Sequence, residues 1–177
     1  SGPTNNTFSV VLGDIDGDGD LDLVCGNNGE SNTAYENIGG TFASTPMWSS
    51  DVANETWSVT LGDVDGDGDL DLVCGNSRGS NTVYENLGGT FSTTPIWSSD
   101  PTSGTLSVAL GDVDGDGDLD LVCGNFAESN TVYENTGETF STTPMWSSSP
   151  TNGTLSVALG DMDGDGDFDL VCGNSSE

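Results

Sequence analysis

Residues Asp14–Asp22 read DIDGDGDLD, and closely related nonapeptides begin at Asp63, Asp112 and Asp161, each 49 residues after the previous one. All follow the pattern Asp-x-Asp-Gly-Asp-Gly-Asp-x-Asp, which places five carboxylates within nine residues. Carboxylates this close repel one another unless a cation lies among them. Hard oxygen ligands at this density suit Ca²⁺, and the glycines allow the positive φ angles that wrap a backbone around an ion. The sequence therefore predicts one calcium loop per copy, or about four Ca²⁺ in all.

The first half of the motif also fits an EF-hand loop, but its context does not. An EF-hand needs a helix on each side and a bidentate Glu at loop position 12. Position 12 is instead a cysteine in every copy: Cys25, Cys74, Cys123 and Cys172. The flanking segments, SVALGD before and LDLVCGN after in the third copy, are short, β-branched and bounded by glycine, which predicts strands. We therefore expect a compact loop between two strands, closed by side chains at positions 1, 3, 5 and 9 and a carbonyl near position 7.

The charge balance excludes several classes of partner. There are 30 acidic residues, one basic residue (Arg78) and no histidine, which gives a formal charge of −29. A surface this anionic argues against binding to nucleic acid or to an anionic membrane. No stretch approaches the roughly 18 consecutive apolar residues of a membrane span, so membrane insertion is not expected. Millimolar extracellular calcium would fill even weak loops, which favours an extracellular location, secreted or at a cell surface.

The cysteines occupy the same position in each copy. Equivalent positions on stacked sheets lie about 10 Å apart, beyond the Cα separation that a disulfide allows. We predict that all four are free, buried, small hydrophobic residues.

The whole chain is built from the repeat. A period of 40–50 residues with several short strands predicts propeller blades. In the third copy we expect strands at 106–110, 119–123 and 130–135 and a fourth from 139 towards 146. The predicted fold is all-β, a propeller-type array of four-stranded antiparallel blades. Its parts are a connector at 1–6, blades at 7–55, 56–104 and 105–153, and a partial fourth blade of two strands at 154–177.

Phrases such as VALGDVDGDGDLDLVCGN followed by NTVYENTGETF resemble FG-GAP/VCBS-type repeats, the calcium-binding blades of integrin α-subunit propellers and of many secreted microbial proteins. The resemblance covers essentially the full chain. It implies ligands from the side chains at loop positions 1, 3, 5 and 9 and from the carbonyl at position 7. The implied sites are Asp14, Asp16, Asp18, Asp20 and Asp22; Asp63, Asp65, Asp67, Asp69 and Asp71; Asp112, Asp114, Asp116, Asp118 and Asp120; and Asp161, Asp163, Asp165, Asp167 and Asp169. The FG-GAP tripeptide is missing and the repeat is shorter than an integrin blade, so integrin-type ligand recognition is not implied.

The partial blade and the surface suggest partners. An uncovered blade edge invites pairing with another chain, so we expect either assembly with copies of itself, as a homo-oligomer or fibre-like array, or a segment of a longer array flanked by further repeats. Four Asn-x-Ser/Thr sequons are candidate glycosylation sites: Asn5, Asn54, Asn152 and Asn174. Glycans or a surface protein are further candidate partners.

Catalysis is not expected. Without His or Lys, the Ser–His, Cys–His and Schiff-base arrangements have no base or amine. A propeller lectin is a better alternative, because Trp48, Trp97 and Trp146 recur once per copy, although packing between blades explains them more simply. A non-catalytic accessory segment of a larger secreted protein is another. The sequence thus favours an extracellular calcium-binding repeat protein that acts as a structural or adhesive module and self-assembles through its incomplete blade.

Overall fold

A computed structural model describes residues 5–100, 104–149 and 153–175. Within these ranges the chain consists of strands, turns and bends without a helix, so no helix there is long or apolar enough to cross a membrane. The strands are β1 (Thr7–Gly13), β2 (Asp22–Tyr35), β3 (Trp48–Gly62), β4 (Asp71–Asn76), β5 (Thr82–Tyr84), β6 (Trp97–Ser98), β7 (Thr105–Gly111), β8 (Asp120–Asn125), β9 (Thr131–Tyr133), β10 (Trp146–Ser147), β11 (Thr154–Gly160) and β12 (Asp169–Asn174). The all-β expectation is confirmed.

The third repeat forms a four-stranded antiparallel blade. Its sheet has the order β10-β9-β8-β7. From the inner strand, β7, to the outer strand, β10, the strands follow one another in chain order. The outermost strand is shorter than expected, because residues 139–145 form bends and a single bridge between Phe140 and Asn135. Pro144 lies in this irregular part, where its missing N–H costs no ladder hydrogen bond. The last repeat contributes the two-stranded sheet β11-β12.

The first two blades share one long strand. β3 begins as the outer strand of the first blade, where Trp48 pairs with Ala34, and ends as the inner strand of the second, where Leu61 pairs with Leu72. The result is one six-stranded sheet in the order β1-β2-β3-β4-β5-β6. Residues 51–55, the last residues of the first predicted blade, are part of β3, and Ala53 pairs with Ser31 of β2.

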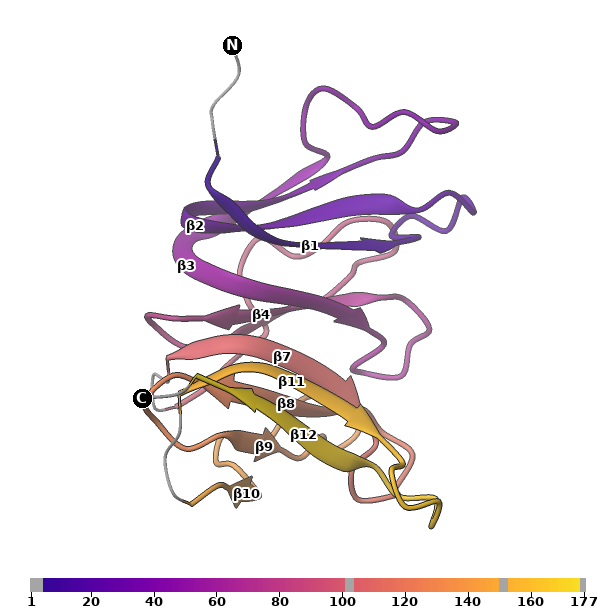
Figure 1. The fold of residues 1–177 in the computed structure, drawn as a ribbon. Helices are drawn as coiled ribbons and strands as arrows, with labels where there is room; N and C mark the ends of the chain where they lie inside the picture. The colour runs from indigo at the N-terminus through magenta and orange to yellow at the C-terminus, as the bar shows by residue number, and fades with distance from the viewer. Residues whose placement is uncertain (1–4, 101–103, 150–152, 176–177) are drawn as a thin grey trace.

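The blades stack on one another in an open array (Figure 1). The inner strands lie side by side: β1 against β3, β3 against β7, and β7 against β11. The same hydrogen bond recurs at each step, because the N–H of Val59, Val108 and Val157 donates to Oγ of Ser9, Ser58 and Ser107, respectively, at 3.1 Å. The array described here is therefore three full blades and a half blade, as the sequence predicts.

The hydrophobic core lies between blades rather than within one. Between the first and second blades, Trp48 packs edge-on against Tyr84 and Phe91, with ring centroids 5.2 and 5.3 Å apart. Between the second and third blades, Trp97 does the same with Tyr133 and Phe140, at 5.3 and 5.4 Å. Trp48 and Trp97 are each only 5% exposed. The packing interpretation of these two tryptophans is confirmed, and neither is available to a glycan.

The cysteines are free, as predicted. Cys25, Cys74 and Cys123 are buried, and Cys172 is half-buried. Burial raises the pKa of Cys74 and of Cys123 to about 12, so both are neutral thiols. An asparagine of the preceding blade donates to three of these sulfurs: Asn32 Nδ2 to Cys74 Sγ at 3.3 Å, Asn81 to Cys123 at 3.3 Å and Asn130 to Cys172 at 3.2 Å.

Two equivalent glycines test how tightly the blades pack. A Cβ on Gly75 would lie 2.7 Å from Val108 Cγ1 and 3.0 Å from Thr105 Cγ2 of the next blade, whereas at Gly173 the nearest atoms would be 3.7 Å away. We predict that Gly75→Ala lowers the free energy of unfolding by about 1–3 kcal/mol, as overpacking does. Gly173→Ala should change it by less than about 0.5 kcal/mol. Denaturant unfolding of both variants with calcium present measures this, and equal effects would contradict close packing at the Gly75 interface.

Candidate metal centres

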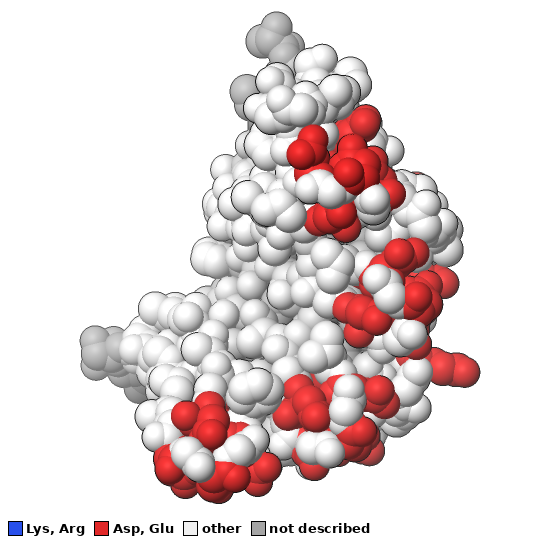
Figure 2. All heavy atoms as spheres, turned by 90° about the vertical axis from the view of Figure 1, so that its right-hand side faces the viewer, with Lys and Arg blue, Asp and Glu red and all other residues white. Residues whose placement is uncertain are grey.

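Each acidic nonapeptide connects the first two strands of a blade. The loops lie between β1 and β2, β3 and β4, β7 and β8, and β11 and β12. Because the inner strands of successive blades lie side by side, the loops that follow them lie on one side of the array. Figure 2 shows the acidic side chains as separate clusters that follow one another along that side.

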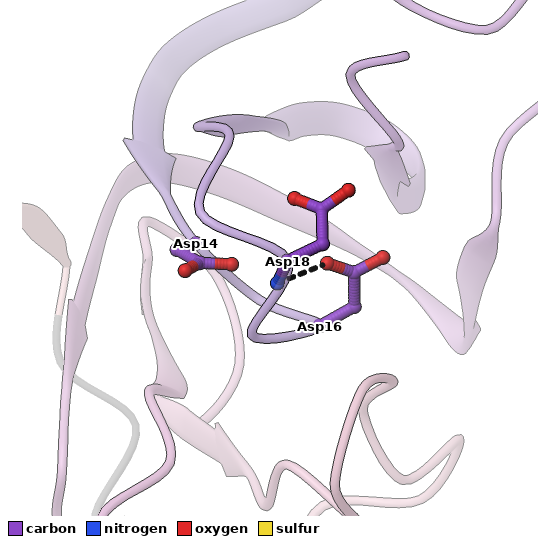
Figure 3. A group of neighbouring side chains, drawn as sticks. All are labelled: Asp14, Asp16 and Asp18. Carbon is purple, nitrogen blue, oxygen red and sulfur yellow. Dashed lines mark hydrogen bonds between the residues drawn. The ribbon is translucent and has the colours of Figure 1, made fainter. Parts of the chain in front are cut away.

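The loops are folded tightly around their own carboxylates. In the first loop, Asp14 Oδ1 accepts the N–H of Gly17 at 2.8 Å, and Asp14 Oδ2 accepts that of Gly19 at 3.0 Å. Asp16 Oδ1 accepts the N–H of Asp18 at 3.2 Å (Figure 3). Gly17 and Gly19 have φ of 76° and 94°, which other residues rarely adopt. The glycines are therefore needed for the backbone to turn back on the side chain of Asp14.

Each loop brings at least three carboxylates together. In each group, each member offers one carboxylate oxygen, and these oxygens all lie within 4.8 Å of one another: Asp14, Asp16 and Asp18; Asp63, Asp65 and Asp71; Asp112, Asp114 and Asp120; and Asp161, Asp163 and Asp169. Loop positions 1 and 3 belong to every group, position 5 to the first and position 9 to the other three. Oxygen donors without nitrogen or sulfur are the set that hard cations such as Ca²⁺ prefer. These four groups could each hold a metal ion.

The aspartate at position 7 has a different place in the first loop. The Asp20 side chain accepts the N–H of Gly39, in the turn after β2, at 3.2 Å. Its carboxylate thus points towards the outer part of the blade. None of the four groups includes a position-7 side chain: Asp20, Asp69, Asp118 and Asp167. This placement is compatible with a position-7 contribution through the backbone carbonyl, which stays a prediction.

The aspartate at position 9 is the most buried member of the first three loops. Asp22, Asp71 and Asp120 are at most 1% exposed. Oδ2 of each accepts the N–H of the residue at loop position 2, Ile15, Val64 or Val113, at 3.1, 2.9 and 2.9 Å. Each of these carboxylates therefore holds the first and last turns of its loop together.

The same carboxylates also bind the outer half of the blade, through residues that sequence reasoning missed. Oδ1 of Asp22, Asp71 and Asp120 accepts the backbone N–H of Asn37, Asn86 and Asn135 at 2.8, 2.8 and 2.9 Å. Asn86 Nδ2 then donates to the carbonyl of Ile15 in the preceding blade at 2.9 Å, and Asn135 Nδ2 to that of Val64 at 2.7 Å. The signal was present as the Glu-Asn pair that follows a tyrosine in each of the first three copies. Asn86 and Asn135 thus connect the loops of their own blades to the loop of the preceding blade.

Burial makes the ionised form of Asp71 costly without a cation. Desolvation raises the pKa of Asp71 to about 6, although N–H donors from Asn86 and Val64 oppose it, and the nearby Asp65 and Asp67 add to it. Desolvation also raises the pKa of Asp65 and of Asp114. A divalent cation among these oxygens would reverse this effect by favouring the charged carboxylates.

The candidate glycosylation sites are dispersed. Asn5 is half-buried before β1, Asn54 is half-buried within β3, and Asn174 is exposed at the end of β12. Asn152 lies outside the described residues. Glycosylation at these sequons stays a prediction.

Comparison with known families assigns the repeat. The model of the FG-GAP-like repeat matches residues 14–74, 63–123 and 112–172, and each match begins and ends on the same loop-and-strand positions. The matches together cover most of the chain. The chain belongs to the FG-GAP-like repeat family, in agreement with the resemblance seen in the sequence.

Solved structures with similar folds are distant in sequence. BBS1N in complex with ARL6DN matches with a TM-score of 0.62 and 11% identity, over 97% of this chain and 51% of that one. The Vibrio cholerae biofilm matrix protein Bap1 matches with a TM-score of 0.58 and 20% identity, over 95% of this chain and 28% of that one. This chain thus spans about half of the first and less of the second, and the likeness concerns the fold. No curated protein sequence matches it.

The raised pKa of Asp71 predicts an unusual pH dependence for the calcium-free protein. The pKa of Asp71 is 3.8 as an ordinary carboxyl in the unfolded chain and about 6 in the fold. At a pH between these two values, Asp71 is therefore protonated in the folded protein and ionised in the unfolded chain. The free energy of unfolding should therefore fall as the pH rises through this range, and the melting temperature in chelator should be higher at pH 5 than at pH 7.

Asp71→Asn is the matched control, because it removes the titrating group and keeps the side-chain shape. Melting curves in chelator between pH 4.5 and 7.5 should be flatter for this variant than for the parent. Identical slopes for the two proteins would contradict a role for Asp71.

Proposed function

We propose that this chain is a calcium-stabilised structural or adhesive module of an extracellular protein. The observation that carries the proposal is the set of four carboxylate groups, one per repeat, in a chain with a formal charge of −29. Proteins of this charge need either high solvation of their acids or bound cations to remain compact. The burial of the position-9 aspartate in the first three loops favours bound cations.

In the calcium-loaded form, carboxylate oxygens from loop positions 1, 3, 5 and 9 and the carbonyl of position 7 would hold each ion. The ion supplies positive charge at the turn between the two inner strands of a blade. The ion would also stabilise the outer half of the blade through the position-9 aspartate, because this side chain accepts the backbone N–H of Asn37, Asn86 or Asn135. Calcium binding thereby becomes part of the folding energy of a chain that is only 32% hydrophobic.

The proposed role is non-catalytic. Four nearly identical sites in a row suit a scaffold better than an active site, which is normally one asymmetric constellation. The fold shared with a biofilm matrix protein supports an adhesive role outside the cell. The fold shared with BBS1N, whose structure is a complex with ARL6DN, supports binding to protein partners. The free edge of the half blade is the proposed place of assembly with further copies or repeats.

Glycan binding is a second candidate, at a different place from the repeated tryptophans. A groove of about 480 Å³ is lined by Trp57, Leu106, Phe126 and Leu155. Arg78 and Glu55, which form an ion pair at 3.2 Å, also line it. Trp57 is 40% exposed and Phe126 51%. Exposed aromatic faces beside polar groups suit the stacking of a sugar ring.

A glycan array tests this second function. Hits for the parent protein that disappear with Trp57→Ala, while the melting temperature stays within about 3 °C, are expected for a lectin site. An array without hits would reject it and leave the structural role.

Removal of calcium tests the main proposal. Each site at a calcium concentration of 100 times its dissociation constant adds about 2.7 kcal/mol to the free energy of unfolding. Several sites together should raise the melting temperature by at least about 10 °C over that in excess chelator. Scanning calorimetry in calcium and in chelator measures the difference, and coincident curves would contradict the proposal.

Two aspartates of the second loop provide the matched control. Asp63 belongs to the carboxylate group, whereas the Asp69 side chain at position 7 does not. Titration calorimetry should find one weakened site of the four in Asp63→Asn and four unchanged sites in Asp69→Asn. Equal losses would show that charge alone, without specific coordination, accounts for calcium binding.

A further inference from the structure

An apolar groove lies between the third blade and the half blade. It has a volume of about 490 Å³ and is lined chiefly by Val113, Val132, Met145, Trp146, Leu170 and Cys172. Trp146 is 47% exposed here, whereas its counterparts Trp48 and Trp97 are each 5% exposed. The groove is thus the third copy of an interface that is filled in the first two.

The filled copies show what occupies this space. Around Trp48 the occupants are Tyr84, from β5, and Phe91, from the turn that follows it. Around Trp97 they are Tyr133, from β9, and Phe140. In both cases the tyrosine and the phenylalanine are seven residues apart, on the third strand of the next blade and its turn. The half blade has only β11 and β12, so no such strand covers Trp146 in the described part of the chain.

Polar groups around the groove repeat the same pattern. Asp71 and Asp120 each accept two backbone N–H groups, one from their own loop and one from the third strand. Asp169, their counterpart, accepts the backbone N–H of Met162 at 2.9 Å. Among the described residues, no third-strand donor reaches Asp169. The amide of Asn125 donates to the carbonyl of Ser129 at 2.7 Å, whereas the equivalent Asn174 is exposed. The free groups are therefore those that a third strand would satisfy.

We propose that this groove binds an extended polypeptide segment with the pattern Ser-Asn-Thr-Val-Tyr-Glu-Asn-x-Gly-x-x-Phe, added as a third strand antiparallel to β12. Its register follows β4 and β5, where Leu72 pairs with Tyr84 and Cys74 with Thr82. The tyrosine and phenylalanine pack on Trp146, and the asparagine after the glutamate donates its backbone N–H to Asp169. Strand addition to a free sheet edge, with alternate side chains in pockets, is a general mode of peptide recognition.

A folded second copy does not fit this groove as well. In a second copy, the equivalent Tyr35 and Phe42 belong to a folded blade that contains β1 and β2. Packing that blade on Trp146 would bring its β1 and β2 to the place on the third blade that β11 and β12 already occupy. An unpaired strand meets no such obstruction. The inference deepens the proposed assembly role, because it assigns to the free edge an unpaired strand of a further copy or repeat rather than a folded blade, and it rests on that proposed function.

The test uses the calcium-loaded full chain and a synthetic peptide of residues 129–143, Ser-Asn-Thr-Val-Tyr-Glu-Asn-Thr-Gly-Glu-Thr-Phe-Ser-Thr-Thr. Titration calorimetry should give one peptide per chain. A control peptide with Tyr133→Ala and Phe140→Ala, and the protein variant Trp146→Ala, should each weaken binding by about tenfold or more, since each removes the aromatic packing.

Cys172 provides an independent readout, because it lines the groove and is half-buried. Bound peptide should slow its alkylation by iodoacetamide at least about fivefold, as protection follows occupancy. Cys74 and Cys123, which are fully buried, serve as internal controls in the same peptide map. The melting temperature with and without chelator, measured on the same sample, reports the proposed calcium role separately from peptide binding.

Three outcomes would overturn the inference. The first is the lack of both heat and Cys172 protection at 1 mM peptide, a concentration at which even weak strand addition is measurable. The second is equal binding of the control peptide. The third is protection of Cys172 by self-association that the peptide does not compete away, which would assign the groove to a second copy.

Discussion

One buried carboxylate per full blade connects the loop, the blade and the stack. Asp71 is fully buried, accepts an N–H from its own loop and another from the third strand, and lies beside Asp63 and Asp65. The asparagine that donates to it also donates to the preceding blade. Removing charge compensation at this point would weaken the loop, the outer strands and the contact between blades together. The cost of burying a negative charge is thus the physical reason why metal binding and folding belong together in this chain.

Repetition explains how a chain with few apolar residues builds a core. The aromatic residues of one blade meet the tryptophan of the blade before it, so each interface uses residues from two repeats. A single repeat buries neither its tryptophan nor its tyrosine, and stability comes from neighbouring pairs. The comparison of Trp97 with Trp146 makes this visible: the sequence around both is nearly the same, and burial depends on whether a third strand follows.

Much of the architecture was predictable because the repeat supplies its own internal check. The 49-residue period, the strands on both sides of each acidic loop and the free cysteines follow from residue spacing and the strand pattern. The clustering of carboxylates at positions 1 and 3 follows from the short loop and its glycines. The continuity of β3 was not predictable, because residues 51–55 lack the regular alternation of apolar and polar residues that marks a strand. The Glu-Asn pair recurs in the sequence, but the role of its asparagine was not predictable, since the position-9 aspartate that it contacts lies 15 residues away on another strand.

Calcium coordination by the four loops is the central claim, and anomalous scattering from a crystal grown in calcium tests it most directly. Four peaks are predicted, each among the carboxylates of one loop, with oxygen contacts of about 2.3–2.6 Å. A map in which the loops are ordered, calcium is in excess and no peak lies within them would contradict the claim.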